Sequence, residues 1–340
     1  MRTSLKLASL AFATLAGVTA TLQHAQGQTA SAFEGSRITH VGVIVHDAAK
    51  TVQTYREVFG LPVSDPVHFK GTIDFPRDFT GDRDAHPKYS LLTLANVGIE
   101  VMQPEGGASP WREYLEKYGQ GLHHIAFSVK DVHQAIAQLQ ALGGKLELGG
   151  SPGVGYAYVN FRDRLGFTIE LSQMPTARPD APSAVPSSPP AQADTALLGT
   201  RISHIGIFVP DVEKTARLFA AILGTPAPEA KTYPGIVFPK GFTGDPNAHP
   251  KIITFPMNAG VEFAEPQGGK SPWRDYVDKY GPAMHHLGIS AKVGVPDTVA
   301  AFEKKGGTVL LRAPTGVTTF VDLKPEPMAL AIELGSPPKN

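Results

Sequence analysis

The sequence contains no cysteine among its 340 residues. Disulfides, thiolate metal ligands and lipidation of a cysteine at a cleavage site are therefore excluded, so the fold must depend on apolar cores even in an oxidising compartment. The chain also has no excess of charge of either sign, because Lys plus Arg and Asp plus Glu both number 31. This balance gives no electrostatic reason to expect binding to nucleic acid or to an anionic membrane surface.

Long hydrophobic runs are absent except near the N-terminus. There Arg2 and Lys6 precede an apolar segment over residues 7–22, which Ser, Thr and Gly interrupt. The segment falls short of the roughly 20 apolar residues that a membrane span needs. Ala25 and Gly27 follow with the spacing of a signal-peptidase site. We predict a signal peptide over residues 1–27, a secreted or periplasmic protein, and no membrane anchor after cleavage.

The chain does contain a tandem repeat. The stretch "RITHVGVIVHD" at 37–47 returns as "RISHIGIFVPD" at 201–211, and "GIEVMQPEGGASPWREYLEKYG" at 98–119 returns as "GVEFAEPQGGKSPWRDYVDKYG" at 260–281. Internal repeats of this length indicate two homologous domains. We place the first domain at 37–172 and the second at 200–336. Between them, residues 173–199 form a linker rich in Pro, Ala and Ser, which we expect to be solvated and semi-extended.

Each domain is itself double. A strand over 38–45 leads to a helix over 48–59, and a strand over 122–129 leads to a helix over 132–142. Asp47 and Asp131 stand where a helix N-cap is wanted, and Gly60 and Gly143 stand where the chain must turn left-handed after the helix. Short strand-like runs follow both helices, near 67–73, 89–94 and 99–102, and then near 146, 154–161 and 167–171. The predicted unit is a strand, a helix and three strands, used four times, which is an α+β fold.

Histidines and glutamates recur at fixed places in these units. Because side chains alternate along a strand, His124 shares one face with Ala126 and Ser128, while Ile125 and Phe127 face the helices. Glu100 and Glu170 stand among apolar residues near the ends of two other strands. A buried carboxylate is costly without a cation. The candidate metal ligands, in the order His, Glu, His, Glu, are His40, Glu100, His124 and Glu170, and then His204, Glu262, His286 and Glu333.

Two neutral imidazoles and two carboxylates suit a divalent transition metal that keeps positions open for water or substrate. For any single histidine, a hydrogen-bonded structural role is the simpler interpretation. The repetition of the whole set in register favours metal sites. By the same alternation, the His123 side chain is predicted to point away from His124 and to have a supporting or structural role. Trp111 and Trp273 lie on short amphipathic helices and are predicted to be packing residues.

These modules, "ITHVGVIVHD…GIEVMQPEGG" and "GLHHIAFSVKD…GFTIELS", resemble the vicinal oxygen chelate superfamily, which includes glyoxalase I, methylmalonyl-CoA epimerase, extradiol dioxygenases and bleomycin-resistance proteins. The resemblance covers nearly all of 37–172 and 201–335. It implies paired βαβββ modules in U-shaped mixed sheets, two such domains in tandem, and the eight ligands named above. It also implies a divalent ion, such as Zn, Ni, Co, Mn or Mg, or Fe(II) in an oxygenase.

The resemblance is nearest to the glyoxalase and epimerase branch. It implies an isomerase or lyase that stabilises an enolate of a small substrate chelating through two oxygens. Glu170 or Glu100 would act as the base in the first domain and Glu333 in the second. His86 and His249, in the repeated "AHPK", are further acid-base candidates, although a loop-binding or strand-capping role is the simpler interpretation.

Three alternatives remain open. A non-haem iron ring-cleaving dioxygenase would need two histidines and one carboxylate, and a glutamate at position 100 weighs against it. A non-catalytic binding or resistance protein would commonly lack the ligand set. One domain could also be catalytic and the other structural. Export would separate the substrate from coenzyme A thioesters and glutathione adducts, which are cytoplasmic. The sequence is compatible with a monomer of paired domains or with a homodimer.

Overall fold

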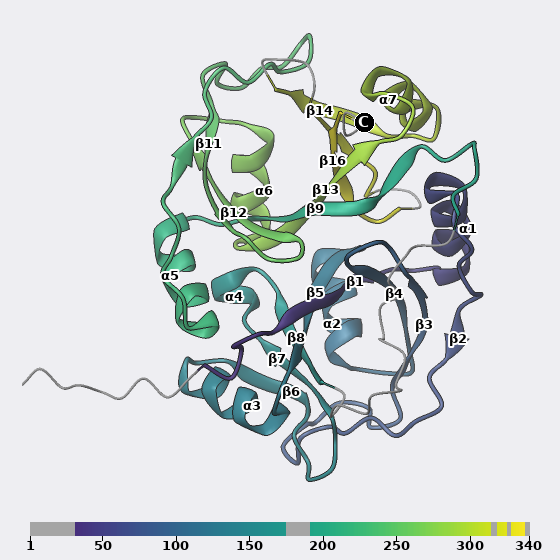
Figure 1. Cartoon of the computed structure of the whole chain (residues 1–340), viewed down its shortest axis with the longest axis vertical. Helices are drawn as coiled ribbons and strands as arrows, with labels where there is room; N and C mark the ends of the chain where they lie inside the picture. Colours follow the sequence, from purple (N-terminus) through teal and green to yellow (C-terminus); the bar gives the residue numbers. More distant parts are fainter. Residues whose placement is uncertain (1–30, 175–190, 314–317, 325–327, 337–340) are drawn as a thin grey trace, which may run out of the picture. The chain divides into compact units, whose positions relative to one another are not determined.

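The computed structural model describes residues 31–174, 191–313, 318–324 and 328–336. The predicted signal peptide at 1–27 and most of the predicted linker lie outside these residues. Two eight-stranded mixed sheets make up the described part, each flanked by its own helices (Figure 1). The predicted α+β fold with paired βαβββ modules in tandem is confirmed.

The first sheet has the strand order β2-β3-β4-β1-β5-β8-β7-β6. At its centre β1 pairs antiparallel with β5, and these two strands pair in parallel with β4 and β8, one from each module. The two modules therefore join through their first strands. The strand bounds are β1 Arg37–Ile44, β2 Val67–His68, β3 His86–Leu92, β4 Gly98–Glu105, β5 Gly121–Val129, β6 Lys145–Gly149, β7 Tyr156–Asn160 and β8 Thr168–Gln173.

The helices of the first half begin and end with the predicted caps. Asp47 and Asp131 accept hydrogen bonds from backbone N–H groups in the first turns of α1 (Ala48–Phe59) and α3 (Val132–Ala141). Gly60 follows α1 with φ 62°, in the left-handed region that glycine tolerates best. Two further helices are α2 (Pro110–Tyr118) and α4 (Arg162–Leu165). These caps fix where each helix leaves the sheet.

The second sheet repeats the first, in the order β10-β11-β12-β9-β13-β16-β15-β14. Its strands are β9 Leu198–Phe208, β10 Lys231–Thr232, β11 His249–Phe255, β12 Gly260–Gln267, β13 Ala283–Ala291, β14 Thr308–Arg312, β15 Thr319–Asp322 and β16 Ala331–Gly335. Its helices are α5 (Val212–Leu223), α6 (Pro272–Tyr280) and α7 (Val295–Lys304).

One strand prediction needs correction. The run expected near 67–73 is a strand only over Val67–His68, and the next strand starts at His86 rather than at Tyr89. Gly71, Pro76 and Gly81 interrupt the segment between them. Glycine and proline both weaken strand pairing, so the chain forms a loop there.

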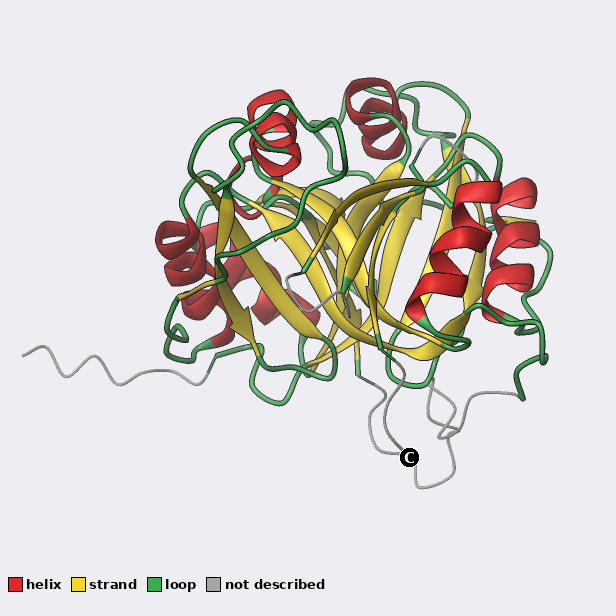
Figure 2. Ribbon diagram, turned by 90° about the horizontal axis from the view of Figure 1, so that it is seen from above, coloured by secondary structure: helices red, strands yellow, loops and turns green. Residues whose placement is uncertain are grey.

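Each sheet is curled and has two different faces (Figure 2). The convex face of the first sheet, with Val41, Val43, Ile125 and Phe127, is buried against a large apolar core that α1 and α3 also enter. The concave face carries a smaller cluster around Trp111 of α2. The predicted packing role of Trp111 and Trp273 is confirmed, since both are buried in such clusters.

The large core is shared by both halves. Phe219 of α5 packs against Phe127 and Phe167 of the first half, and the Tyr55 hydroxyl donates to the Met328 carbonyl oxygen at 2.9 Å. Asn96 and Asn258 occupy equivalent positions and each donates to the other's backbone carbonyl, at 2.6 and 2.9 Å. The two halves are therefore joined by apolar packing and by reciprocal hydrogen bonds.

The last part of the predicted linker belongs to this joint. The Leu197 N–H donates to the Val58 carbonyl, the Ala193 N–H donates to Gly60, and Ala196 and Leu198 are fully buried. Residues 196–198 are thus packed rather than solvated, whereas Ala191 and residues 193–195 are exposed. In the part of the chain that the structure describes, we find no helix both long and apolar enough to cross a membrane.

Candidate metal centres

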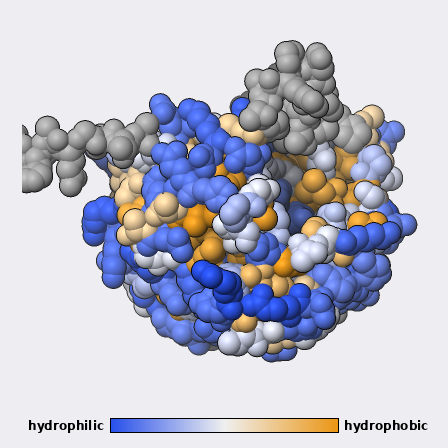
Figure 3. Space-filling view, turned by 90° about the horizontal axis from the view of Figure 1, so that it is seen from below, coloured by the Kyte–Doolittle hydropathy of each residue, from blue (hydrophilic) through white to orange (hydrophobic). Residues whose placement is uncertain are grey.

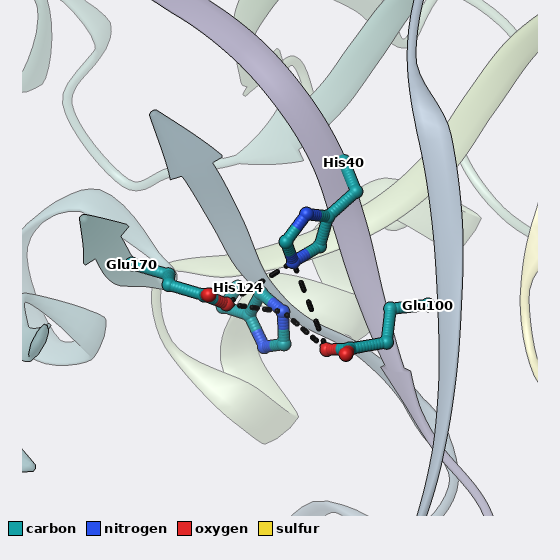
Figure 4. A group of neighbouring side chains, drawn as sticks. All are labelled: His40, Glu100, His124 and Glu170. Carbon is teal, nitrogen blue, oxygen red and sulfur yellow. Dashed lines mark hydrogen bonds and ion pairs between the residues drawn. The ribbon is translucent and has the colours of Figure 1, made fainter. Parts of the chain in front are cut away.

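Strand register brings the four predicted ligands of the first half together. Gly42 of β1 lies opposite His124 of β5 on one side and opposite Glu100 of β4 on the other. Ala126 of β5 lies between His40 and Glu170 in the same way. Each ligand thus comes from a different central strand, and all four side chains point to one place on the concave face (Figure 4).

The ligand atoms are close enough to share one ion. His40 Nε2 lies 3.1 Å from Glu170 Oε2 and 3.7 Å from Glu100 Oε2. His124 Nε2 lies 3.2 Å from Glu170 Oε2 and 3.4 Å from Glu100 Oε2. The two imidazole Nε2 atoms thus face two carboxylate oxygens. Two imidazoles and two carboxylates at these separations suit a borderline divalent metal.

The second half builds the same group from His204, Glu262, His286 and Glu333. His204 Nε2 lies 3.1 Å from Glu333 Oε2 and 3.2 Å from His286 Nε2. The Thr254 hydroxyl donates to Glu262 at 3.5 Å. All eight residues were predicted from the sequence, and the structure brings them together as two sets of four.

Two observations test whether a metal fits the first set. His124 is fully buried and its Nε2 makes no hydrogen bond, despite facing two carboxylates. A buried polar atom without a partner is costly, and a metal ion would satisfy it. Gly42 leaves the space for the His124 ring, because a Cβ at position 42 would overlap that ring. Gly206 leaves the same space for His286. The residues present therefore fit a divalent ion.

The electrostatics of both sets favour bound positive charge. Burial alone would lower the pKa of His40, but the Glu170 and Glu100 carboxylates overcome it and raise that pKa to about 9. Burial would also lower the pKa of His204, but the Glu262 and Glu333 carboxylates outweigh burial and raise that pKa to about 9. Burial raises the pKa of Glu262, whereas the neighbouring histidines overcome burial at Glu333 and hold its pKa well below the usual range. A metal ion would replace the protons that these sites now retain.

His123 does not point away from His124 as simple alternation predicts. The register between β1 and β5 shifts at this point, since Gly42 faces His124 and Val43 faces Leu122. This β-bulge puts both rings on the concave side, with their Nδ1 atoms 3.1 Å apart. The same shift occurs in β13, where His285 Nδ1 lies 3.3 Å from His286 Nδ1. The predicted supporting role fits this geometry, although the predicted direction is wrong.

A cavity of about 240 Å³ opens beside the first set. Glu100 and Glu170 line it, and the rest of its wall is apolar and aromatic, formed by Phe69, Ile73, Pro87, Tyr89, Met102, Trp111, Leu148, Tyr156 and Tyr158. On the face shown in Figure 3, apolar residues come to the surface in recessed places bordered by hydrophilic ones. A small molecule with a flat or apolar part would fit beside the four ligands.

Tyr158 and the indole of Trp111 are site residues that sequence reasoning missed. Tyr158 lies opposite Glu170 on the neighbouring strand, with its ring centroid 5.1 Å from that of His124. Burial raises the pKa of Tyr158 well above its usual range, so the hydroxyl stays a donor. The buried Trp111 Nε1 has no hydrogen-bond partner. Pairing of β7 with β8 in the predicted sheet would have indicated Tyr158 as the neighbour of Glu170, whereas no sequence pattern indicated a site role for Trp111.

The two sets differ at this aromatic position. Phe320 stands opposite Glu333 where Tyr158 stands opposite Glu170, and its ring centroid lies 4.9 Å from that of His286. Only the first set therefore has a phenol beside it at this position.

The structure places His86 and His249 away from both sets. His86 lies opposite Glu105, five residues along β4 from Glu100, which corresponds to about 16 Å at 3.3 Å per residue. His249 lies opposite Gln267 in the equivalent place. Each histidine Nδ1 lies 2.9 Å from a backbone carbonyl of its own loop, that of Asp84 or Asn247. This geometry matches the loop-binding interpretation.

The sequence profile of the Glyoxalase/Bleomycin resistance protein/Dioxygenase superfamily matches residues 39–161 and 203–320. The chain is also similar to the ethylmalonyl-CoA/methylmalonyl-CoA epimerase of Cereibacter sphaeroides, with 28% identity over 144 residues, covering 41% of this chain and 98% of that protein. It is 24% identical to the human mitochondrial methylmalonyl-CoA epimerase over 155 residues, covering 43% of this chain and 78% of that protein.

Among solved structures, a mutant of 4-hydroxymandelate synthase from Streptomyces coelicolor superposes with a TM-score of 0.54 and 16% identity. The match covers 89% of this chain and 94% of that one. At this identity the likeness shows the fold alone. It extends over both sheets, whereas the epimerases correspond in length to less than half of the chain.

Proposed function

Because the chain belongs to the Glyoxalase/Bleomycin resistance protein/Dioxygenase superfamily, we propose that it is a divalent-metal-dependent enzyme that moves a proton at a carbon next to a carbonyl group, as an isomerase or lyase. The observation that carries the proposal is the complete set of two histidines and two glutamates, present once in each sheet. The similarity to two epimerases supports the same class of chemistry.

In this proposal His40, Glu100, His124 and Glu170 hold the ion in the first half, and His204, Glu262, His286 and Glu333 hold it in the second. A bound divalent ion would act there as a Lewis acid for substrate oxygens. The four ligands come from four strands that are hydrogen-bonded side by side, so their positions are set by the sheet. Such preorganised polar groups need not rearrange when charge develops on a substrate oxygen.

We propose Glu170 and Glu333 as the bases that take the proton. Burial would raise the pKa of Glu170, but His40 and His124 lower it, so the carboxylate is ionised and able to accept a proton. The same balance holds at Glu333. Return of the proton by the same base to the same face of the carbon gives simple exchange, whereas epimerisation needs a second group to deliver a proton to the opposite face.

The cavity beside the first four-residue set supports a proposal for the class of substrate. Its aromatic wall would contact an apolar or planar part of the molecule, while Glu100 and Glu170 mark the polar end. The unpaired Trp111 N–H and the Tyr158 hydroxyl are donors for a substrate oxygen. We propose a small carbonyl compound with a second oxygen on a neighbouring atom. If the chain is exported, as we also propose, this compound lies outside the cytoplasm.

Solvent deuterium exchange tests the function directly. The purified protein, loaded in turn with Zn²⁺, Ni²⁺, Co²⁺, Mn²⁺ or Mg²⁺, is incubated in D₂O with methylmalonyl-CoA and with a panel of small 2-hydroxy and 2-oxo carbonyl compounds. We expect deuterium at the carbon next to the carbonyl, seen by NMR, and its loss in the Glu170→Gln, Glu333→Gln double variant. No exchange with any metal, together with oxygen consumption by the Fe(II) form on catechols, would replace the proposal with an oxygenase.

A further inference from the structure

A third group of metal-ligating side chains lies outside both four-residue sets. It consists of His68 on β2, His86 on β3 and Glu105 on β4. His68 Nδ1 lies 2.6 Å and His86 Nε2 lies 3.3 Å from the same oxygen, Oε2 of Glu105. The two imidazole centroids are 6.5 Å apart. One carboxylate oxygen therefore has an imidazole nitrogen on each of two sides.

The orientation of His86 suits a metal ligand. Its Nδ1 lies 2.9 Å from the Asp84 carbonyl oxygen, which has no proton to give, so His86 donates from Nδ1. In a neutral ring this leaves the lone pair on Nε2, the atom that faces Glu105. A backbone carbonyl that fixes the tautomer in this way is the usual support of a metal-bound histidine.

We propose that His68, His86 and Glu105 bind a divalent transition ion, of the class that includes Zn²⁺, Cu²⁺ and Ni²⁺, independently of the two sites of the proposed enzyme. Two imidazoles and one carboxylate are ligands that these ions favour, and water would complete the coordination. The side chains are 61%, 37% and 24% exposed, so an ion can reach them from solvent. The neighbouring residues Pro87 and Tyr89 alternate to the other face and line the cavity.

The second half provides a natural comparison because it lacks two of the three ligands. Its equivalent positions hold Thr232, His249 and Gln267, as the pairing of Thr232 with Lys251 and of His249 with Gln267 shows. His249 is held by the Asn247 carbonyl at 2.9 Å, just as His86 is held by Asp84. The backbone and one histidine are thus conserved between the halves, while the carboxylate and the second imidazole are present only in the first.

The proposed ion would connect three adjacent strands at one edge of the sheet. β2 has only two residues, and Phe69, which follows it, lines the cavity. Binding would tie this short edge strand to β3 and β4 and so fix one wall of the cavity. We therefore expect the amides of residues 67–69 to exchange more slowly with D₂O when this ion is bound.

The test removes the two four-residue sites first, through the His124→Ala, His286→Ala double variant of the full chain without an affinity tag. Titration with Zn²⁺ and Cu²⁺ should show one ion per chain, and Cu²⁺ should give an electron paramagnetic resonance spectrum with nitrogen couplings. Adding His68→Thr or Glu105→Gln, the residue types found in the second half, should weaken binding at least tenfold. If Thr232→His and Gln267→Glu are added to the double variant instead, the second half should gain an ion-binding site of similar affinity.

The proposal is overturned if the double variant binds no ion, or if His68→Thr leaves the bound ion and its spectrum unchanged. Circular dichroism of each variant verifies the fold. These outcomes do not depend on catalysis, so they are distinct from failure of the proposed enzyme activity.

Discussion

The Nδ1 atoms of His123 and His124 lie 3.1 Å apart because a β-bulge turns both rings to the same face of the sheet. Burial, with Arg162 and His124, lowers the pKa of His123 well below its usual range, so His123 is neutral. Arg162 Nη1 lies 3.2 Å from His123 Nε2, and because a guanidinium only donates, the His123 proton is on Nδ1, facing His124 Nδ1. At the equivalent pair, burial, with His286 and Lys324, lowers the pKa of His285, and no such donor reaches its Nε2 among the described residues. His285 Nδ1 can therefore accept from His286 Nδ1–H, which leaves the lone pair of His286 Nε2 for a metal.

Replacing His285 should therefore weaken the second metal site without removing a ligand. We expect His285→Phe to lower the affinity of that site for Zn²⁺ by about 10- to 100-fold, the usual effect of losing a group that orients a ligand. The measurement is competition with a chromophoric chelator in a His124→Ala background. The matched change, His123→Phe, should weaken the first site less when His286→Ala removes the second, because His123 does not accept from His124. Unchanged affinity in His285→Phe would show that this histidine does not support the ligand.

The glycine opposite each ligand histidine gives a second prediction. Gly42→Ala would place a Cβ into the His124 ring, so the ring must move away from the other ligands. We expect about one metal ion less per chain by elemental analysis and a loss of roughly 1–3 kcal/mol in the free energy of unfolding. Gly155→Ala is the control, because a Cβ there would meet Gln173 only at 3.4 Å. Full metal content in Gly42→Ala would contradict the packing argument.

Proton release should accompany metal binding. The pKa values of His40 and His204 are raised from 6.5 to about 9 in the metal-free protein, so both rings carry protons at pH 7.5. Binding should release about one proton per site, which calorimetry in buffers of different ionisation enthalpy measures. Because these pKa values are raised by folding, the stability they contribute is complete below pH 6.5 and is lost as the pH rises through 9. The metal-loaded protein should not show this loss.

The joint between the halves predicts cooperative unfolding. Asn96 donates to the carbonyls of Ile202 and Asn258, at 2.8 and 2.6 Å, and accepts from the Ile202 N–H at 3.1 Å. Asn96→Ala leaves these buried backbone groups unpaired, so we expect a loss of about 2 kcal/mol or more. Asn258→Ala should cost a similar amount, and the double variant less than the sum. Calorimetry should show one transition in the parent, whereas two well-separated transitions would mean that the halves fold independently.

Export remains a prediction, since residues 1–30 lie outside the described structure. Expression in a host with a secretory pathway should yield a chain that begins near Gln28, as measured by intact mass. Ala25→Arg should block processing, because the cleavage site requires a small residue. A processed Ala25→Arg variant, or a parent that keeps Met1, would contradict this prediction.

Most of the fold and all eight candidate ligands followed from the sequence because both depend on local, repeated signals. Asp47 and Gly60 mark the ends of a helix, and strand alternation separates His40 from Val41. Bulges escape such reasoning, since an extra residue in one strand is visible only against its partner. The predicted direction of the His123 side chain was wrong for that reason. The His68, His86 and Glu105 group was missed because its members are far apart in sequence and meet only through the pairing of three strands.

The reciprocal bonds of Asn96 and Asn258 are the kind of self-complementary contact found across the twofold axis of a homodimer. Here one polypeptide supplies both partners, so the contact no longer depends on protein concentration. Because the two halves are covalently linked, each has a fixed effective concentration of the other. Either half is then free to change its own site, as Tyr158 and Phe320 already differ, without losing its partner to exchange with another chain.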